Sequence, residues 1–98
     1  MNLDGEWDVK VTSGPVLFKA LNLLKDRKII KGDSGYNIAR GVKWGKFLIW
    51  QGENKTKLIY TESKISDYIT RTSDNAYWGE FYYNGKFVGN FEMTRVED

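Results

Sequence analysis

The chain contains no cysteine and no histidine, and it has a single proline. Without cysteine there is no disulfide framework, no thiolate nucleophile and no zinc–cysteine site. Without histidine, the usual general base and the commonest metal ligand are both missing. We therefore expect a protein that is not an enzyme, holds no metal and needs no cofactor.

An excess of charge of one sign is also missing, since 15 Lys and Arg face 13 Asp and Glu and leave a net charge of +2. So small an excess gives little electrostatic attraction for nucleic acid. The longest apolar stretch, residues 16–24, is interrupted by Lys19 and Asn22 and is far shorter than the roughly 20 residues that a spanning helix needs. The first residues also lack the basic and apolar segments of a signal peptide. We expect a cytoplasmic protein with no membrane partner.

What is present is the composition of one globular domain. The chain has 98 residues, of which 41% are hydrophobic and 29% charged, and a chain of this length fills a single hydrophobic core. Alternating apolar and polar residues predict strands at residues 3–12, 27–31, 35–40, 43–51, 55–61, 65–72, 76–83 and 86–95. Residues 16–25 instead repeat apolar side chains at helical spacing, after Pro15, which suits the first position of a helix.

Eight short strands joined by tight turns predict a mainly β fold, an antiparallel up-and-down barrel with one short helix between the first and second strands. Residues 1–98 then form a single barrel domain. A strongly bent sheet wrapped on the helix is the alternative.

The clearest turn signal is Asn84-Gly85, because both central positions of a type I′ turn require a positive φ. A two-residue turn there pairs Tyr82 with Phe87. Continued in that register, one face of the last three strands is the more aromatic, and we predict that it points into the barrel. This face contains Ser66, Tyr68, Thr70, Trp78, Glu80, Tyr82, Phe87 and Phe91.

An inward aromatic face with one carboxylate is typical of a small-molecule cavity. The predicted ligand-binding residues are Tyr68, Trp78, Glu80, Tyr82, Phe87 and Phe91. Glu80 either contacts a polar group of the ligand or pairs with Arg95 or Tyr68. The same aromatic side chains can instead fill a small barrel solid.

The opposite face of these strands offers a second hypothesis. It carries apolar side chains that, if exposed, would mark a homodimer or protein-partner surface; these are Ile69, Tyr77, Phe81 and Val88.

Basic and aromatic residues alternate between residues 43 and 50, a composition typical of platforms that bind single-stranded nucleic acid. In a regular strand, however, Lys46 and Trp50 share one face, while Lys43 and Phe47 share the other. The basic and aromatic residues are thus divided between two faces, and the net charge is only +2. Nucleic-acid binding is therefore the less favoured alternative.

The two ends of the chain resemble those of a known family. Residues 3–9 (LDGEWDV) resemble the Gly-x-Trp signature that opens lipocalins and related calycin barrels, and residues 17–21 (LFKAL) are similar to the helical stretch that follows it in fatty-acid-binding proteins. Residues 93–96 (MTRV) resemble the closing strand. The resemblance implies a small calycin-like barrel in which Arg95 packs over Trp7, and it leaves the class of ligand open.

The first functional hypothesis is accordingly a non-enzymatic binding protein, a small calycin-like barrel that holds an apolar or aromatic small ligand, with residues 16–25 as its lid or plug. The alternative is a protein–protein interaction or inhibitor module that uses an exposed aromatic face of the barrel.

Overall fold

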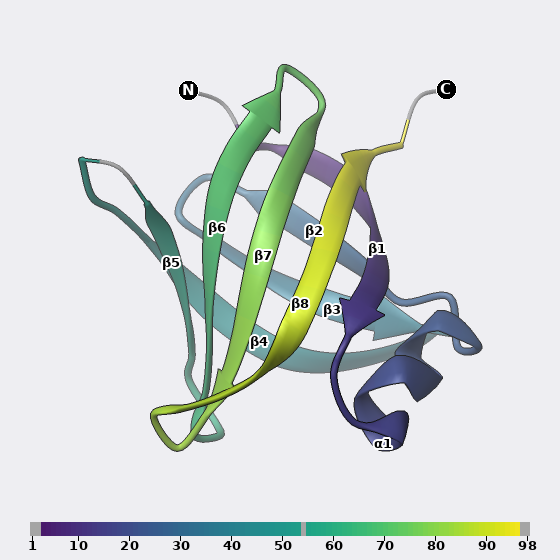
Figure 1. Ribbon diagram of the computed structural model, residues 1–98. Coiled ribbons are helices and arrows are strands. Elements are labelled where there is room, and N and C mark those ends of the chain that lie inside the picture. Colours follow the sequence, from purple (N-terminus) through teal and green to yellow (C-terminus); the bar gives the residue numbers. More distant parts are fainter. Residues whose placement is uncertain (1–2, 54, 97–98) are drawn as a thin grey trace.

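The computed structural model describes residues 3–53 and 55–96, and in them the chain closes into an eight-stranded barrel. Each strand pairs with the next in antiparallel fashion, and β8 returns to pair with β1 (Figure 1). The strands are β1 (Gly5–Ser13), β2 (Arg27–Lys31), β3 (Ser34–Ala39), β4 (Val42–Gln51), β5 (Thr56–Tyr60), β6 (Ile65–Ser73), β7 (Ala76–Tyr83) and β8 (Lys86–Arg95). The predicted closed barrel with one short helix is confirmed, and closure excludes the bent-sheet alternative.

The short helix is less regular than predicted. It consists of α1 (Val16–Lys19) and the 3₁₀ helix η1 (Ala20–Asn22) rather than a continuous helix to residue 25. It ends early because the Asn22 side chain bonds to the β1 backbone: its Oδ1 accepts from the Val11 amide at 2.7 Å, and its Nδ2 donates to the Val11 carbonyl at 2.9 Å. Such side-chain bonds compete with helical ones.

Two side chains of this segment close one end of the barrel. Phe18 is buried and packs against Phe81 with ring centroids 4.5 Å apart, and Leu21 contacts the same core. By contrast, Val16 and Leu17, which helical spacing places on the buried stripe, are 83% and 88% exposed. We call α1 and η1 together the plug; Phe18 and Leu21 are the side chains by which it packs into the end of the barrel.

The interior is filled by side chains from all eight strands and from the plug. The buried apolar set comprises Leu3, Trp7, Val11, Phe18, Ile30, Phe47, Leu58, Tyr60, Ile69, Tyr77, Phe91 and Met93. An eight-stranded barrel is just wide enough for such a core. Consistent with that narrowness, a Cβ on Gly79 would collide with the Phe91 ring.

The predicted inward face of β6–β8 is wrong for two reasons: on β6 and β7 the opposite face, with Asp67, Ile69 and Tyr77, is the buried one, and β8 contains a bulge. Tyr82 pairs with Phe87 as the Asn84-Gly85 turn requires, and the β6–β7 register is also the predicted one. Val88 is then an extra residue on β8, so that Phe81 rather than Glu80 pairs with Gly89. A shift by one residue exchanges the two faces of a strand, and beyond the bulge β8 turns its other side inward.

Most of the predicted ligand-binding residues consequently lie outside. Trp78 is 38% and Phe87 53% exposed, and Tyr68, Glu80 and Tyr82 are half-buried on the same outer face. Ser66 and Thr70 belong to that face as well. Phe91 alone is inside.

The residues predicted as a possible partner surface form part of the interior instead. Ile69 and Tyr77 are buried, and Phe81 and Val88 are half-buried against the core. These four side chains therefore do not form the exposed face on which the prediction of a homodimer or partner surface depended.

Candidate functional site

A polar cluster occupies the centre of the barrel. It consists of Lys28 on β2, Asn37 on β3, Tyr60 on β5 and Asp67 on β6, all buried. Lys28 Nζ donates to Asn37 Oδ1 at 2.8 Å and to the Tyr60 hydroxyl at 2.7 Å, and it lies 3.2 Å from Asp67 Oδ2. The Tyr60 hydroxyl donates to Asp67 Oδ2 at 2.9 Å. The three ammonium protons thus have three acceptors, as a buried cation requires.

Aromatic rings surround the ammonium group of this cluster. Lys28 Nζ lies 5.2 Å from the Phe47 ring centroid, 5.4 Å from that of Tyr60 and 5.5 Å from that of Phe91. These are cation–π distances. The lysine is thus held by one carboxylate and three aromatic rings.

Burial shifts the proton affinity of the acidic members. It raises the pKa of Asp67, against the opposing effects of Lys28 and the Tyr60 hydrogen bond. Burial also raises the pKa of Tyr60 well above its ordinary value, and the neighbouring Asp67 carboxylate adds to this effect. Tyr60 is therefore a phenol at physiological pH and serves as a hydrogen-bonding link.

The cluster leaves one buried side-chain polar atom of the described residues without a hydrogen bond, Asp67 Oδ1. Asp67 lines a cavity beneath the plug together with Phe18, Asp26, Trp44 and Phe81, and this cavity measures only about 10 Å³. That is room for about one water molecule. This cavity, as the described residues form it, is too small for an apolar or aromatic ligand.

Asp26 is the second buried carboxylate at this end of the barrel. Its Oδ1 accepts a hydrogen bond from Trp44 Nε1 at 3.0 Å, and its backbone amide bonds to the Leu21 carbonyl at the end of the plug. Burial raises the pKa of Asp26 to about 6, with Lys28 and Trp44 acting in the opposite direction. Asp26 joins the plug to the barrel wall.

At the opposite end of the barrel (Figure 1), Arg95 covers Trp7. The guanidinium carbon lies 4.3 Å from the Trp7 ring, and the two residues are register partners on β8 and β1. Arg95 also donates to the Asp4 carbonyl at 2.6 Å and to Asn75 Oδ1 at 3.1 Å. The contact predicted from the calycin resemblance is present.

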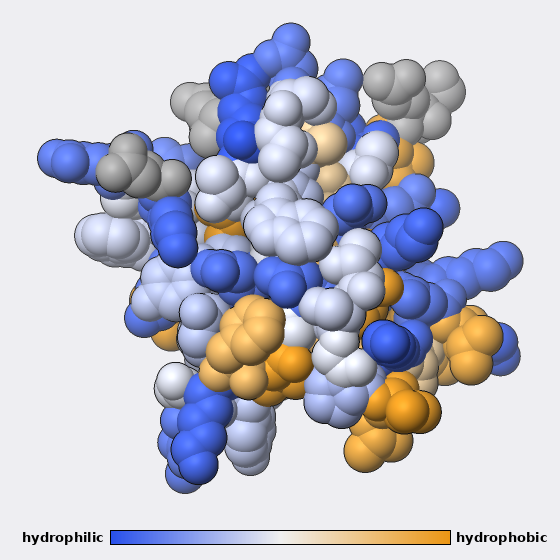
Figure 2. Space-filling model, viewed as in Figure 1, coloured by the Kyte–Doolittle hydropathy of each residue, from blue (hydrophilic) through white to orange (hydrophobic). Residues whose placement is uncertain are grey.

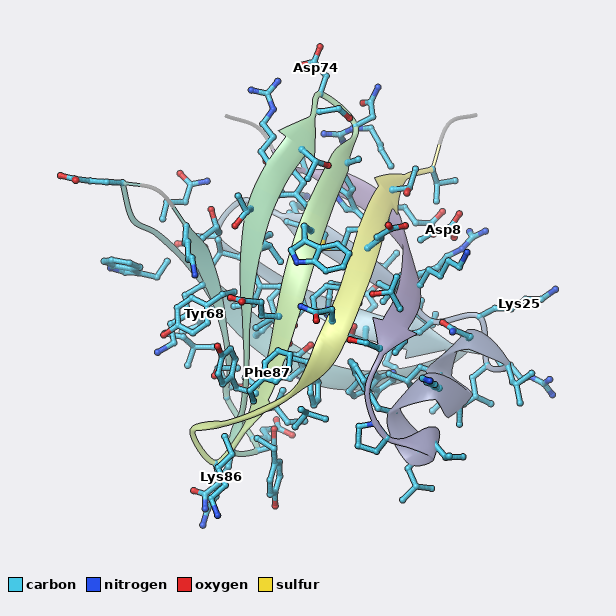
Figure 3. All side chains as sticks on the ribbon, in the orientation of Figure 1. Asp8, Lys25, Tyr68, Asp74, Lys86 and Phe87 are labelled. Carbon is cyan, nitrogen blue, oxygen red and sulfur yellow. The ribbon has the colours of Figure 1, made fainter. Side chains whose placement is uncertain are left out.

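The outer side of β4–β8 gathers the large side chains that the interior does not use. Tyr68, Tyr82 and Phe87 form a continuous edge-to-face row, with centroids 5.5 and 5.7 Å apart. Figure 2 shows pale and orange side chains among blue ones over β6–β8, and Figure 3 shows Tyr68 and Phe87 close together there. We call this surface the outer aromatic face; its members are Leu48, Trp50, Ile59, Tyr68, Trp78, Tyr82 and Phe87.

Charges of both signs are interspersed on the outer aromatic face. Lys55 and Lys57 lie 5.8 and 5.3 Å from the Tyr68 ring centroid, and Lys55 Nζ is 3.3 Å from Glu80 Oε1. Of its two predicted partners, Tyr68 lies opposite Glu80 in the β6–β7 register, whereas the cation that pairs with Glu80 is Lys55 and not Arg95. Beside Trp78, the register partner on β8 is Glu92.

The lysine and aromatic side chains of β4 do not alternate regularly between its inner and outer faces. Gly45 has a φ of 62°, which breaks the alternation between Trp44 and Lys46. Trp44 consequently turns toward the Asp26 carboxylate, whereas Lys46 and Trp50 both stay exposed on the outside.

The buried polar cluster is the feature that sequence reasoning missed. A signal was available for Asp67, which alternates with Ile65 and Ile69 and so shares an apolar face. For Lys28, the short β2 pattern gives no comparable indication.

Comparisons with known proteins do not assign the chain to a family. No protein-family model matches the chain, and no significant match is found among curated proteins or solved structures. Within residues 3–53 and 55–96 no cluster of three potential metal ligands occurs. No helix in this part of the chain has the length and apolar character needed to cross a bilayer.

Proposed function

We propose that this chain is a non-enzymatic binding module that recognises another protein through the outer aromatic face. The main observation in support is the row of aromatic rings formed by Tyr68, Tyr82 and Phe87. The indoles of Trp50 and Trp78 are exposed on the same face. Exposed aromatic groups at this density are typical of protein interfaces, where Trp and Tyr supply most of the binding energy. In the described residues, α1 and η1 lie at the end of the barrel and leave this face uncovered (Figure 1).

The charges around the aromatic row favour a protein partner over nucleic acid. Lys55 is paired with Glu80, and Glu92 lies beside Trp78. A phosphate backbone would select for unpaired cations along its track, whereas a protein partner can match a rim of both signs. The partner surface should offer apolar side chains at its centre and charges of both signs at its edge.

Two further features support the non-enzymatic part of the proposal. The buried lysine and tyrosine that could carry chemistry are both bonded to Asp67 Oδ2, and the cavity beside them has room for only about one water molecule. A small ligand inside the barrel would therefore have to displace the plug.

The calycin relationship is also a proposal; it is supported by the closed up-and-down topology and by the Trp7–Arg95 contact. A cytoplasmic location remains a prediction.

Site-specific photo-crosslinking in the protein's own host tests the proposal. A photoreactive phenylalanine analogue at Trp78 or Phe87 should give the same protein adduct. The matched control is the analogue at Leu17, which is more exposed but lies on α1 and outside this face, and it should not give that adduct.

The double variant Trp50→Ser with Phe87→Ser should weaken binding of the partner identified in this way by at least about tenfold. Its thermal stability should be nearly unchanged because both side chains are exposed. Adducts with a second copy of the chain alone, or adducts that form equally at Leu17, would contradict the proposal.

A further inference from the structure

Exposed aliphatic side chains gather at the plug end of the barrel, away from the outer aromatic face. Val16, Leu17 and Leu23 are 83%, 88% and 74% exposed, and Leu24 and Val42 are also exposed. Figure 2 shows orange surface over α1, where the plug projects from the barrel. We call these five residues the aliphatic tip.

The tip is continuous with the barrel wall. Arg40, in the turn between β3 and β4, donates from Nη2 to the Leu23 carbonyl at 3.3 Å, which fixes this turn against the plug. A groove of about 460 Å³, lined by Leu21, Leu24, Ala39, Arg40, Val42 and Trp44, extends the apolar surface inward. Leu24 and Val42 thus line one groove, and Leu23 lies beside Arg40 at its edge, while Val16 and Leu17 project from α1 of the same plug.

Cations border the aliphatic tip. Lys19, Lys25 and Arg40 are exposed beside it, and Figure 3 shows Lys25 extending away from the barrel. Residues 14–25 and 39–46 contain no acidic residue. The nearest carboxylate, Asp26, is buried, and Glu6 and Asp8 are engaged by Arg27 at 3.0 and 2.9 Å. Asp8, which lines a pocket together with Lys25, is the exposed carboxylate at this end, and the cations Lys19, Lys25 and Arg40 outnumber it around the tip.

We propose that the plug end docks on an anionic lipid surface, with the aliphatic tip inserted among the headgroups and acyl chains. Projecting aliphatic side chains with flanking lysines are the combination that binds peripherally to bilayers containing acidic lipids. A protein interface would more often present aromatic anchors, which this chain places on its other surface. The sequence predicts no membrane partner because it lacks a spanning segment, but peripheral docking needs none.

Cosedimentation with sucrose-loaded vesicles tests this proposal, using phosphatidylcholine alone and phosphatidylcholine mixed with phosphatidylserine. Each cation near the surface contributes about fivefold to binding. The full chain should therefore bind the mixed vesicles on the order of a hundredfold more strongly, and added salt should weaken this binding.

Matched variants separate the tip from the rest of the surface. Lys19→Ala with Lys25→Ala should weaken binding to the mixed vesicles roughly thirtyfold, and Leu17→Ser with Leu23→Ser on the order of tenfold. The control pair, Tyr83→Ser with Lys31→Ala, removes one exposed apolar side chain and one exposed lysine that belong to neither named surface, and it should bind like the unmodified chain.

Circular dichroism and thermal melting of each variant establish that it is folded. Equal binding to both vesicle types, or equal losses in the tip and control variants, would overturn the proposal. So would binding to polyglutamate without binding to vesicles, since this would identify an acidic polypeptide as the occupant.

Discussion

Replacing Asp26 by Asn is expected to stabilise the barrel at neutral pH. The carboxylate is buried, and its pKa is raised from 3.8 to about 6. Such a shift means that keeping Asp26 ionised in the folded state costs about 3 kcal/mol. An amide retains an acceptor for Trp44 Nε1, which now bonds to Oδ1 at 3.0 Å. Burying the amide N–H groups offsets part of the gain, so we expect a net stabilisation of about 1–2 kcal/mol.

The direction in which pH changes the free energy of unfolding follows from the raised pKa of Asp26. Between about pH 4 and 6, the unfolded chain has already released the Asp26 proton while the folded chain still holds it. The free energy of unfolding should therefore fall as pH rises through this window and should change little from this group above it. The raised pKa of Asp67 acts in the same direction, so the Asn variant should keep a smaller dependence on pH.

Urea unfolding followed by tryptophan fluorescence measures both effects, with the variant and the unmodified chain compared at pH 4 and pH 8. The stability difference should be small at the lower pH and should favour the Asn variant at the higher one. A variant that is less stable at pH 8, or one with the same pH dependence as the unmodified chain, would refute the reasoning. The first result would mean that the Asp26 carboxylate is stabilising as an ion, and the second that folding does not shift its pKa.

Three further substitutions test the packing. Arg95→Lys should lose most of the roughly 0.5–2 kcal/mol of the guanidinium–indole contact, and in equilibrium unfolding it should be less than additive with Trp7→Phe; full additivity would count against the contact. Lys28→Met leaves a buried carboxylate without its cation and should cost about 3–5 kcal/mol, whereas an unchanged urea midpoint would show that the cluster contributes nothing. Gly79→Ala places a methyl group against the Phe91 ring and should lower stability by about 1–3 kcal/mol; no loss in a thermal melt would show that the core yields freely.

The barrel could be predicted because local signals repeat along the chain. The alternation in residues 27–31, 76–83 and 86–95 gives the bounds of β2, β7 and β8 as observed. The Asn84-Gly85 turn fixes the pairing of its flanking residues because both positions have the positive φ that a type I′ turn needs, 51° and 77°. Such features depend on neighbours in the sequence alone.

The faces could not be predicted because they depend on non-local packing. The bulge at Val88 reverses the direction of β8 side chains, and its cause lies elsewhere: a Cβ on Gly89 would collide with the Ser13 carbonyl oxygen at the end of β1. Choosing the more aromatic face as the inner one is also misleading in so narrow a barrel. Gly79 faces inward because the Phe91 ring needs its space, and Trp78, the next residue along β7, consequently lies outside although it is larger.

The central claim, that the chain binds a protein through its outer aromatic face and does not carry a ligand inside, is tested most directly by native mass spectrometry of the chain isolated from its own host. We expect the mass of the bare chain together with a complex containing a second, different protein. The complex should disappear with Trp50→Ser and Phe87→Ser. A small molecule retained by the chain in equimolar amount, and unaffected by these two substitutions, would contradict the claim.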